Sequence, residues 1–376
     1  MSINNTDSQV INWLRFPMAV LIVLMHTPFL YSVSTDIGLG GMLAVTTHSL
    51  IAQVLAQIAV PLFFLFSGYL FFQNLKEWNS RKYLNKLAKR AKTLLLPYVV
   101  WNLLFFLVPF VIIPFLREGG ADFQALQDRG GWRIFWDNNL FGATEINRIN
   151  IFGMNMPKGA CPIDAPLWFI RDLILISIIA PVIYLIAHYS GKVGLFILGA
   201  LMILDVWFPI RFLSVTGIFF YSLGCWLSIN DKSISDFLPG SWSRIMVFLS
   251  IILFFVSATL LIIKAPPAIL SICVKCFILS SLVMVLKIVN KGVSYNKLKN
   301  YPLLSGSSFF VFALHSGYVM SICSFVISRI LPSTNALSSL LGYVISATLI
   351  TIVCVVVYWF IRKFVPSLLI ILSGGR

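Results

Sequence analysis

Apolar stretches recur from one end of this 376-residue chain to the other, each about 20 residues long, enough for a helix to cross roughly 30 Å of hydrocarbon. Hydrophobic residues make up 59 % of the sequence and charged residues only 11 %, which excludes an ordinary water-soluble domain. The sequence therefore predicts an all-α integral membrane protein in which residues 1–376 form a single multi-spanning domain. We expect about ten transmembrane helices, over residues 10–34, 50–73, 93–116, 166–187, 193–209, 212–229, 243–264, 268–289, 304–328 and 336–361.

The regions outside these stretches contain no sign of a second folded unit. The first apolar stretch is too long for a cleaved leader peptide, contains an arginine and lacks a small-residue cleavage site. We therefore expect a stand-alone membrane domain, without an appended extracytoplasmic domain. The longest connection, at residues 117–165, exceeds ordinary loop lengths and is predicted to be an extracytoplasmic loop that partly covers a site beneath it.

The net charge of +15 could suggest a nucleic-acid partner, but the placement of the cations explains it differently. If the N-terminus is cytoplasmic, about ten helices return the C-terminus to the same side. The segment 74–92 then lies inside, and it is rich in cations: Lys76, Arg81, Lys82, Lys86, Lys89, Arg90 and Lys92. Most cations that fall outside are offset by acidic residues, so the net positive charge lies on the inner side. By the positive-inside rule, the sequence predicts a multi-pass protein of the cell inner (plasma) membrane with both termini cytoplasmic. The charge then needs no nucleic-acid partner to explain it.

Three cations fall inside the expected spans: Arg15, Arg171 and Lys275. Ionisable side chains at membrane depth are costly, so each is a candidate functional residue. The alternative for each is that the long side chain reaches back to the membrane interface.

Arg15 shares its helix with His26, 11 residues further on. Eleven steps of about 100° come within about 20° of three full turns, so both side chains lie on one face, roughly 16 Å apart along the helix. A lone histidine in an apolar helix more often hydrogen-bonds to a neighbouring helix. Two polar groups on one face at different depths are more typical of the lining of a passage.

Five segments, in matching order, resemble the acyltransferase-3 family of membrane acyltransferases. These are "INWLRFPMAVLIVLMHT" (11–27), "VPLFFLFSGYLF" (60–71), "KRAKTLLLPYVVWN" (89–102), "PLWFIRDL" (166–173) and "SSFFVFALH" (307–315). One feature departs from the family pattern. Many members have a tight Arg-x-x-Arg before the proline of the third segment, whereas this chain has Lys89, Arg90 and Lys92.

The resemblance implies transfer of an acyl group, most often acetyl from acetyl-CoA, to a saccharide or lipid-linked glycan acceptor at the outer side. Lys89, Arg90, Lys92 and Arg15 would hold the phosphates of the acyl-CoA donor by charge-assisted hydrogen bonds. Arg15 could also polarise the thioester carbonyl. His26 would act either as a general base on the acceptor hydroxyl or as a transient acyl carrier.

Other residues are weaker candidates. His315 is a second catalytic or relay histidine, or a packing residue, and Trp168, Arg171 and Asp205 are candidate contacts of the acceptor. The pair Cys273 and Cys276 is interpreted as buried filler, so neither a metal site nor a structural disulfide is expected.

Two other classes of protein fit part of the pattern. A solute transporter also has many helices with ionisable residues at membrane depth, although no repeated half is visible here. A non-enzymatic partner in polysaccharide export would share the fold but would not depend on His26. The predicted partners are acyl-CoA, the glycan acceptor and membrane lipids.

Overall fold

The computed structural model describes residues 5–29, 38–75, 77–112, 131–136, 148–151, 154–157, 161–207 and 212–375. Nearly all of this chain is helical, as predicted. The α-helices are α1 (Asn5–His26), α2 (Leu39–Ser49), α3 (Ala59–Phe72), α4 (Ser80–Arg90), α5 (Leu96–Leu107), α8 (Trp168–Ile178), α9 (Ala180–Leu185), α10 (Gly191–Leu204), α11 (Val215–Ile229), α12 (Gly240–Ile262), α13 (Pro267–Ser294), α14 (Pro302–Leu314), α15 (Tyr318–Ile330), α16 (Ala336–Phe364) and α17 (Pro366–Ser373).

Shorter elements join these helices. Four are π-helical, namely η1 (Leu50–Leu55), η3 (Ala91–Leu95), η4 (Val108–Ile112) and η9 (Ile186–Ser190), and three are 3₁₀-helical, namely η2 (Ala56–Ile58), η5 (Gly131–Phe135) and η8 (Ala165–Leu167). An antiparallel hairpin of β1 (Arg148–Ile151) and β2 (Met154–Pro157) belongs to the predicted outer loop. Most of that loop, and the expected turn at residues 209–211, lie outside the described residues.

Seven helical stretches of the described chain are long and apolar enough to cross a membrane, and α14 with α15 forms an eighth if a bend of 89° is allowed. The chain is thus a helical membrane protein. The predicted total of about ten is reached only if α8 and α11, with 11 and 15 residues, also cross. The reason α8 is short is local: the chain turns at Ile179, and the next helix begins at Ala180 with Pro181 in its first turn.

Two segments expected to be loops are helices. Residues 80–90 of the basic segment form α4, whose N-terminus is capped by the Asn79 side chain accepting from the Lys82 amide. α4 continues through η3 into α5, so the basic segment is part of one long helical stretch. Similarly, α2 begins at Leu39, well before the predicted span at residue 50, and continues through η1 and η2 into α3.

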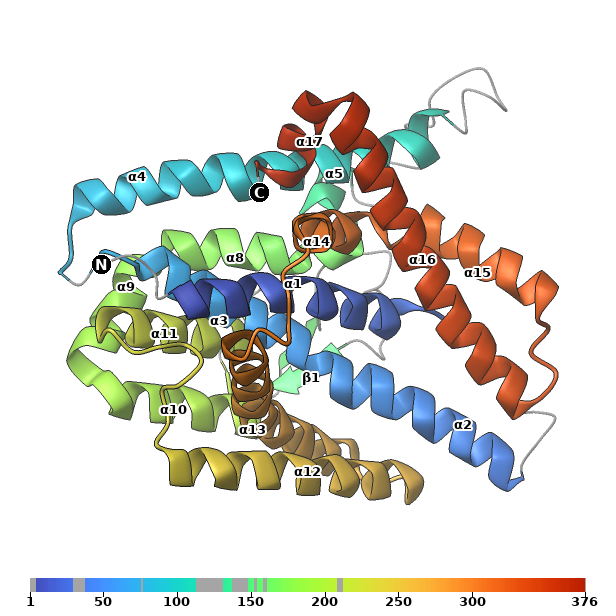
Figure 1. Ribbon diagram of the computed structural model, residues 1–376, viewed down its shortest axis with the longest axis horizontal. Coiled ribbons are helices and arrows are strands. Elements are labelled where there is room, and N and C mark those ends of the chain that lie inside the picture. The colour runs from blue at the N-terminus through green and yellow to red at the C-terminus, as the bar shows by residue number, and fades with distance from the viewer. Residues whose placement is uncertain are drawn as a thin grey trace.

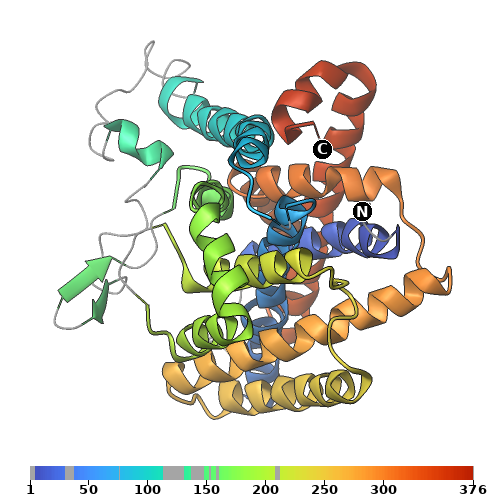
Figure 2. The same cartoon turned by 90° about the vertical axis from the view of Figure 1, so that its left-hand side faces the viewer.

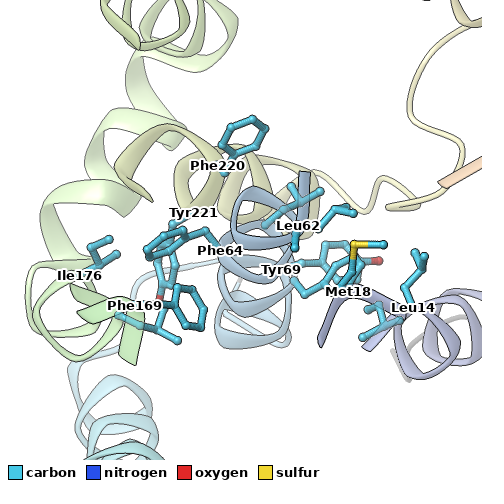
Figure 3. Packing of buried hydrophobic residues seen from close by; sticks show 14 of the residues in the cluster. Leu14, Met18, Leu62, Phe64, Tyr69, Phe169, Ile176, Phe220 and Tyr221 are labelled. Atoms are coloured by element: carbon cyan, nitrogen blue, oxygen red, sulfur yellow. The ribbon is translucent and has the colours of Figure 1, made fainter. Parts of the chain in front are cut away.

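The tightest helix contact in the core joins α3 to α11. A Cβ atom at Gly68 would lie 2.2 Å from the Tyr221 carbonyl oxygen, and one at Gly224 would lie 2.3 Å from that of Leu65, so only glycine fits at either position. Aromatic rings fill the space beside the crossing, where Phe64 meets Phe169 edge to face at 4.7 Å (Figure 3).

A buried carboxylate joins three segments at one end of the molecule. Asp7, 1 % exposed, accepts hydrogen bonds from the hydroxyls of Tyr69, Ser233 and Ser235 and from the Ile234 amide. The start of α1, the end of α3 and the α11–α12 connection therefore share one side, as the predicted topology requires. Which side faces the cytoplasm stays a prediction.

Figure 1 shows α1 in the middle of the assembly, with α14 seen nearly end-on beside it. In the perpendicular view α14 lies lengthwise, so the two helices cross (Figure 2). α12 lies at the edge in both views, and only 11 % of its most apolar window is buried within the protein. Its apolar side chains are therefore free to face lipid.

Candidate active site

A cavity of about 840 Å³ lies between α1, α3, α4, α8, α14 and α16. Its wall combines aromatic and small polar side chains with a group of cations. The lining residues used below are Arg15, Phe63, Ser67, Phe71, Lys86, Lys89, Arg90, Phe169, Ser308, Phe309, Phe312, Tyr358 and Arg362.

Among the described residues, the cavity lining contains five cations and no acidic side chain; the cations are Arg15, Lys86, Lys89, Arg90 and Arg362. Arg15 is half-buried, and its guanidinium makes no hydrogen bond or ion pair within the described chain. A cluster of cations without a counter-charge attracts a ligand that carries several negative charges. The cavity therefore suits a polyanion with an apolar part.

The orientation of α4 brings its basic residues to the cavity. Lys86, Lys89 and Arg90 are spaced three and four residues apart, so they share one face of the helix. The Lys86 ammonium donates to the Gln73 carbonyl at 2.9 Å, and Arg90 donates to the Ser67 carbonyl at 3.1 Å. Both cations also lie over the Phe71 ring, at 5.8 and 5.5 Å from its centre.

Lys92, predicted to bind the donor with Lys89 and Arg90, does not line the cavity and is exposed. It follows Arg90 by two residues, which turns its side chain by about 200° from that face. The π-helical η3, in which Lys92 lies, further changes the register. Lys86 takes its place in the cationic set. Its spacing from Lys89 and Arg90 is visible in the sequence, and a helical interpretation of this segment would have selected it.

His26 and His315 lie against each other, although they are 289 residues apart in the sequence. His26 Nδ1 is 2.9 Å from His315 Nε2, and the two rings stack with centroids 5.2 Å apart. His315 is fully buried at the end of α14, whereas His26, at the end of α1, is exposed.

The other contacts of His315 fix the direction of this hydrogen bond. His315 Nδ1 faces the carbonyl oxygens of Phe312 and Val311, at 2.8 and 3.2 Å, and carbonyls only accept. The Nδ1 atom of His315 must therefore carry a proton, which in a neutral ring leaves Nε2 as an acceptor. His26 donates to it through Nδ1, so the free Nε2 of His26 has a lone pair available for a substrate.

The cavity and the histidine pair lie along the same two helices, α1 and α14. Arg15 lines the cavity on α1, and His26 follows it on the same face, roughly 16 Å further along. On α14, Phe312 lines the cavity and His315 follows one turn later. Neither histidine belongs to the lining, so the cavity ends about one helical turn short of the pair.

A buried carboxyl group that sequence reasoning missed supports the bend beside His315. Asp164 is fully buried and accepts from the hydroxyl of Ser316, the residue between His315 and the 89° turn into α15. Its amide donates to the Asn102 side chain. Burial raises the pKa of the Asp164 carboxyl well above its usual range, and the hydrogen bond from Ser316 opposes this only in part.

The residues predicted to contact the acceptor are not brought together. Arg171 is 3 % exposed, pairs with Asp172 at 3.0 Å and donates to the Trp136 carbonyl at 2.7 Å. Asp205 is exposed and lies 2.9 Å from Lys275. Trp168 begins α8 and is half-buried. Contact of any of these residues with an acceptor stays a prediction.

The six cysteines form no disulfide with one another, and Cys273 is buried with its thiol 3.3 Å from the Ser257 hydroxyl. Among the described residues, no three His, Cys, Asp or Glu side chains are grouped as metal ligands are.

Comparison with known proteins identifies the family. The acyltransferase-3 family model, described as an acyltransferase domain, matches residues 9–359. The chain belongs to the acyltransferase-3 family. It is also 29 % identical, over 225 residues, to the succinoglycan biosynthesis protein ExoH of Rhizobium meliloti (strain 1021). That match spans 60 % of this chain and 55 % of the relative, about half of its length. No solved structure matches the chain. Family membership confirms the resemblance in the five segments.

Proposed function

We propose that the protein transfers a short acyl group, most often acetyl, from cytosolic acyl-CoA to a hydroxyl of a cell-surface or lipid-linked saccharide. The observation that carries this proposal is the pairing of an acid-free cationic cavity with a histidine pair about one turn beyond its end. Acyl-CoA combines several phosphate charges with a long, largely uncharged pantetheine arm that ends in the thioester. The relative named for succinoglycan biosynthesis supports a saccharide as the acceptor.

The donor would lie with its phosphates among the five cations, held by charge-assisted hydrogen bonds. Arginine suits this task because its planar guanidinium can grip a phosphate with two parallel hydrogen bonds. The unpaired Arg15 is the cation that needs a ligand most, because no group of the described chain neutralises it. The pantetheine arm would extend past Phe312 toward His26.

The transfer consumes no further reactant. The acceptor hydroxyl oxygen attacks the thioester carbonyl carbon, so that a C–O bond forms and the C–S bond breaks. His26 Nε2 takes the hydroxyl proton and delivers it to the departing sulfur, which gives an ester and free CoA. His315 keeps His26 in the required tautomer and accepts a hydrogen bond from the imidazolium that forms, as an orienting partner does in other acyl transferases.

The test uses purified protein in lipid nanodiscs with radiolabelled acetyl-CoA and an oligosaccharide acceptor. His26→Gln should bind acetyl-CoA normally but transfer label roughly 10²–10⁴-fold more slowly, because glutamine cannot take a proton near neutral pH. His315→Gln should cause a milder loss. His188→Gln is the matched control, because His188 stacks on Tyr184 in a different part of the chain and should not matter.

The outcomes separate the competing explanations. Label retained on the protein before acceptor is added would make His26 an acyl carrier instead of a base. Full transfer by His26→Gln would contradict the mechanism. If the native protein released no CoA, a solute transporter or a non-enzymatic partner in polysaccharide export would be the better explanation, and uptake into sealed vesicles would distinguish them.

A further inference from the structure

Four phenylalanines on α3, α8 and α14 line one part of the cavity wall: Phe63, Phe169, Phe309 and Phe312. Their rings form a chain of contacts, with centroids 6.0 Å apart for Phe63 and Phe169, 5.9 Å for Phe169 and Phe312, and 6.2 Å for Phe309 and Phe312. We call this group the phenylalanine collar.

The collar lies directly against the catalytic pair. The Phe312 ring is 6.4 Å from the His315 ring, and its backbone carbonyl accepts the hydrogen bond from His315 Nδ1. Phe169, Phe309 and Phe312 are nearly buried, at 5–7 % exposure. An acyl group that moves along α14 from the cationic part of the cavity toward the histidine pair therefore passes Phe312 and the rings in contact with it.

The collar offers nothing to a charged group. Its four side chains have no polar atoms, and the hydroxyl of the neighbouring Ser308 already donates to the Ser305 carbonyl at 2.8 Å. Arg15, roughly 16 Å from His26 along α1, is assigned to the donor phosphates in the proposed function and so is not available to a carboxylate on the acyl group. A charged acyl group would therefore lose its hydration at the collar without gaining a partner.

We infer that the phenylalanine collar selects the acyl group, admitting a short uncharged acyl chain and excluding one that ends in a carboxylate. This inference rests on the proposed function, since it assumes that acyl-CoA occupies the cavity. It assigns acyl specificity to the collar and CoA affinity to the cations, so the two properties should change independently.

The native protein provides the first arm of the test. Acetyl-CoA, butyryl-CoA and succinyl-CoA would be compared for binding, by displacement of radiolabelled CoA, and for transfer to the acceptor. All three should bind with similar affinity, because they share the CoA phosphates. Transfer of the succinyl group should be roughly 100-fold less efficient than transfer of acetyl in kcat/KM, the penalty expected for carrying a carboxylate through an apolar region.

Variants of the collar provide the second arm. Phe309→Ala should widen the collar and raise the butyryl-to-acetyl ratio of kcat/KM about tenfold, while CoA affinity stays the same. Phe63→Leu, at a half-buried position, is a milder variant that should shift the ratio in the same direction if Phe309→Ala fails to fold. Phe325→Ala is the control, because Phe325 is 58 % exposed on α15.

Two results would overturn the inference: equal transfer of succinyl and acetyl by the native protein, or unchanged ratios in both collar variants. Failure of the proposed function gives a different result, because no acyl-CoA would then bind or release CoA in any variant.

Discussion

Two arginines in apolar helices, Arg15 and Arg171, have opposite environments. The side chain of Arg171 is 3 % exposed and is held by Asp172, by the Trp136 carbonyl and by the Phe212 ring, 4.2 Å below its guanidinium. The side chain of Arg15 faces a cavity lined by four other cations and has no such partner in the described chain. In the sequence alone, both residues are simply cations at membrane depth.

The difference lies in how each charge is compensated. A buried charge whose partners all come from the protein contributes to the fold, because removing one partner leaves the other unpaired. Asp7, with four donors around its carboxylate, belongs to the same class as Arg171. A charge without a partner has to be compensated from outside the chain, so Arg15 indicates a ligand.

The largest effect is expected when the two arginines are replaced in parallel. Arg15→Ala should abolish transfer and Arg15→Lys should reduce it about 10²-fold, because lysine keeps the charge but loses the planar, two-point grip. Both variants should keep the native thermal unfolding midpoint. Arg171→Ala should instead lose about 3–5 kcal/mol of stability, as expected when one partner of a buried ion pair is removed.

Activity and unfolding, measured on the same nanodisc preparations, check this comparison. If Arg15→Lys transferred at the native rate, Arg15 would be an interfacial anchor. If Arg171→Ala were as stable as the native protein, the compensated arginine would not support the fold, and the distinction between the two residues would be lost.

A smaller effect is expected on α4, where the structure separates neighbouring lysines. Lys86→Ser should weaken acetyl-CoA binding about tenfold, because it removes one charge-assisted contact to the phosphates. Lys92→Ser should change the affinity little, since Lys92 is exposed and outside the cavity. Isothermal titration with acetyl-CoA measures both. Equal losses of affinity for the two variants would mean that the whole basic segment attracts acetyl-CoA by its overall positive charge and not through individual contacts.

The sequence was informative wherever a property depends on neighbours along the chain. Hydrophobic length predicted the membrane helices, and the 11-residue spacing predicted that Arg15 and His26 share a face of α1. Family motifs predicted the acyltransferase. Where prediction was wrong, the reason was local: residues 80–90 were expected to form a loop, and the cap at Asn79 shows that a helix begins there.

Contacts between distant segments could not be predicted in the same way. Nothing in the sequence pairs His26 with His315, and nothing distinguishes the compensated Arg171 from Arg15. Arg362 was not selected, because its place in the cavity depends on how α16 packs against α14. Asp164 was not selected, since one aspartate in a long loop carries no signal of burial.

The smallest effect concerns Asp164, a buried carboxyl group whose charge, unlike that of Asp7, is not compensated by surrounding donors. Its Oδ2 atom has no hydrogen-bond partner in the described chain, and burial raises the pKa of the group well above its usual range. The folded protein therefore keeps a proton on Asp164 that the unfolded chain releases above about pH 4. Stability that depends on this proton is present at acidic pH and is lost as the pH rises from there toward the folded-state pKa.

Asparagine stays neutral, and its side-chain oxygen can still accept from Ser316. The thermal midpoint of Asp164→Asn should therefore fall less between pH 5 and pH 8 than that of the native protein, with transfer activity reduced only slightly. Asp164→Ala leaves the Ser316 hydroxyl without its acceptor, so its midpoint should be lower at both pH values, and its activity should fall further because the bend beside His315 loses its support. An Asp164→Asn midpoint that is lower than the native value at both pH values would show instead that the carboxyl group is ionised and compensated, as Asp7 is.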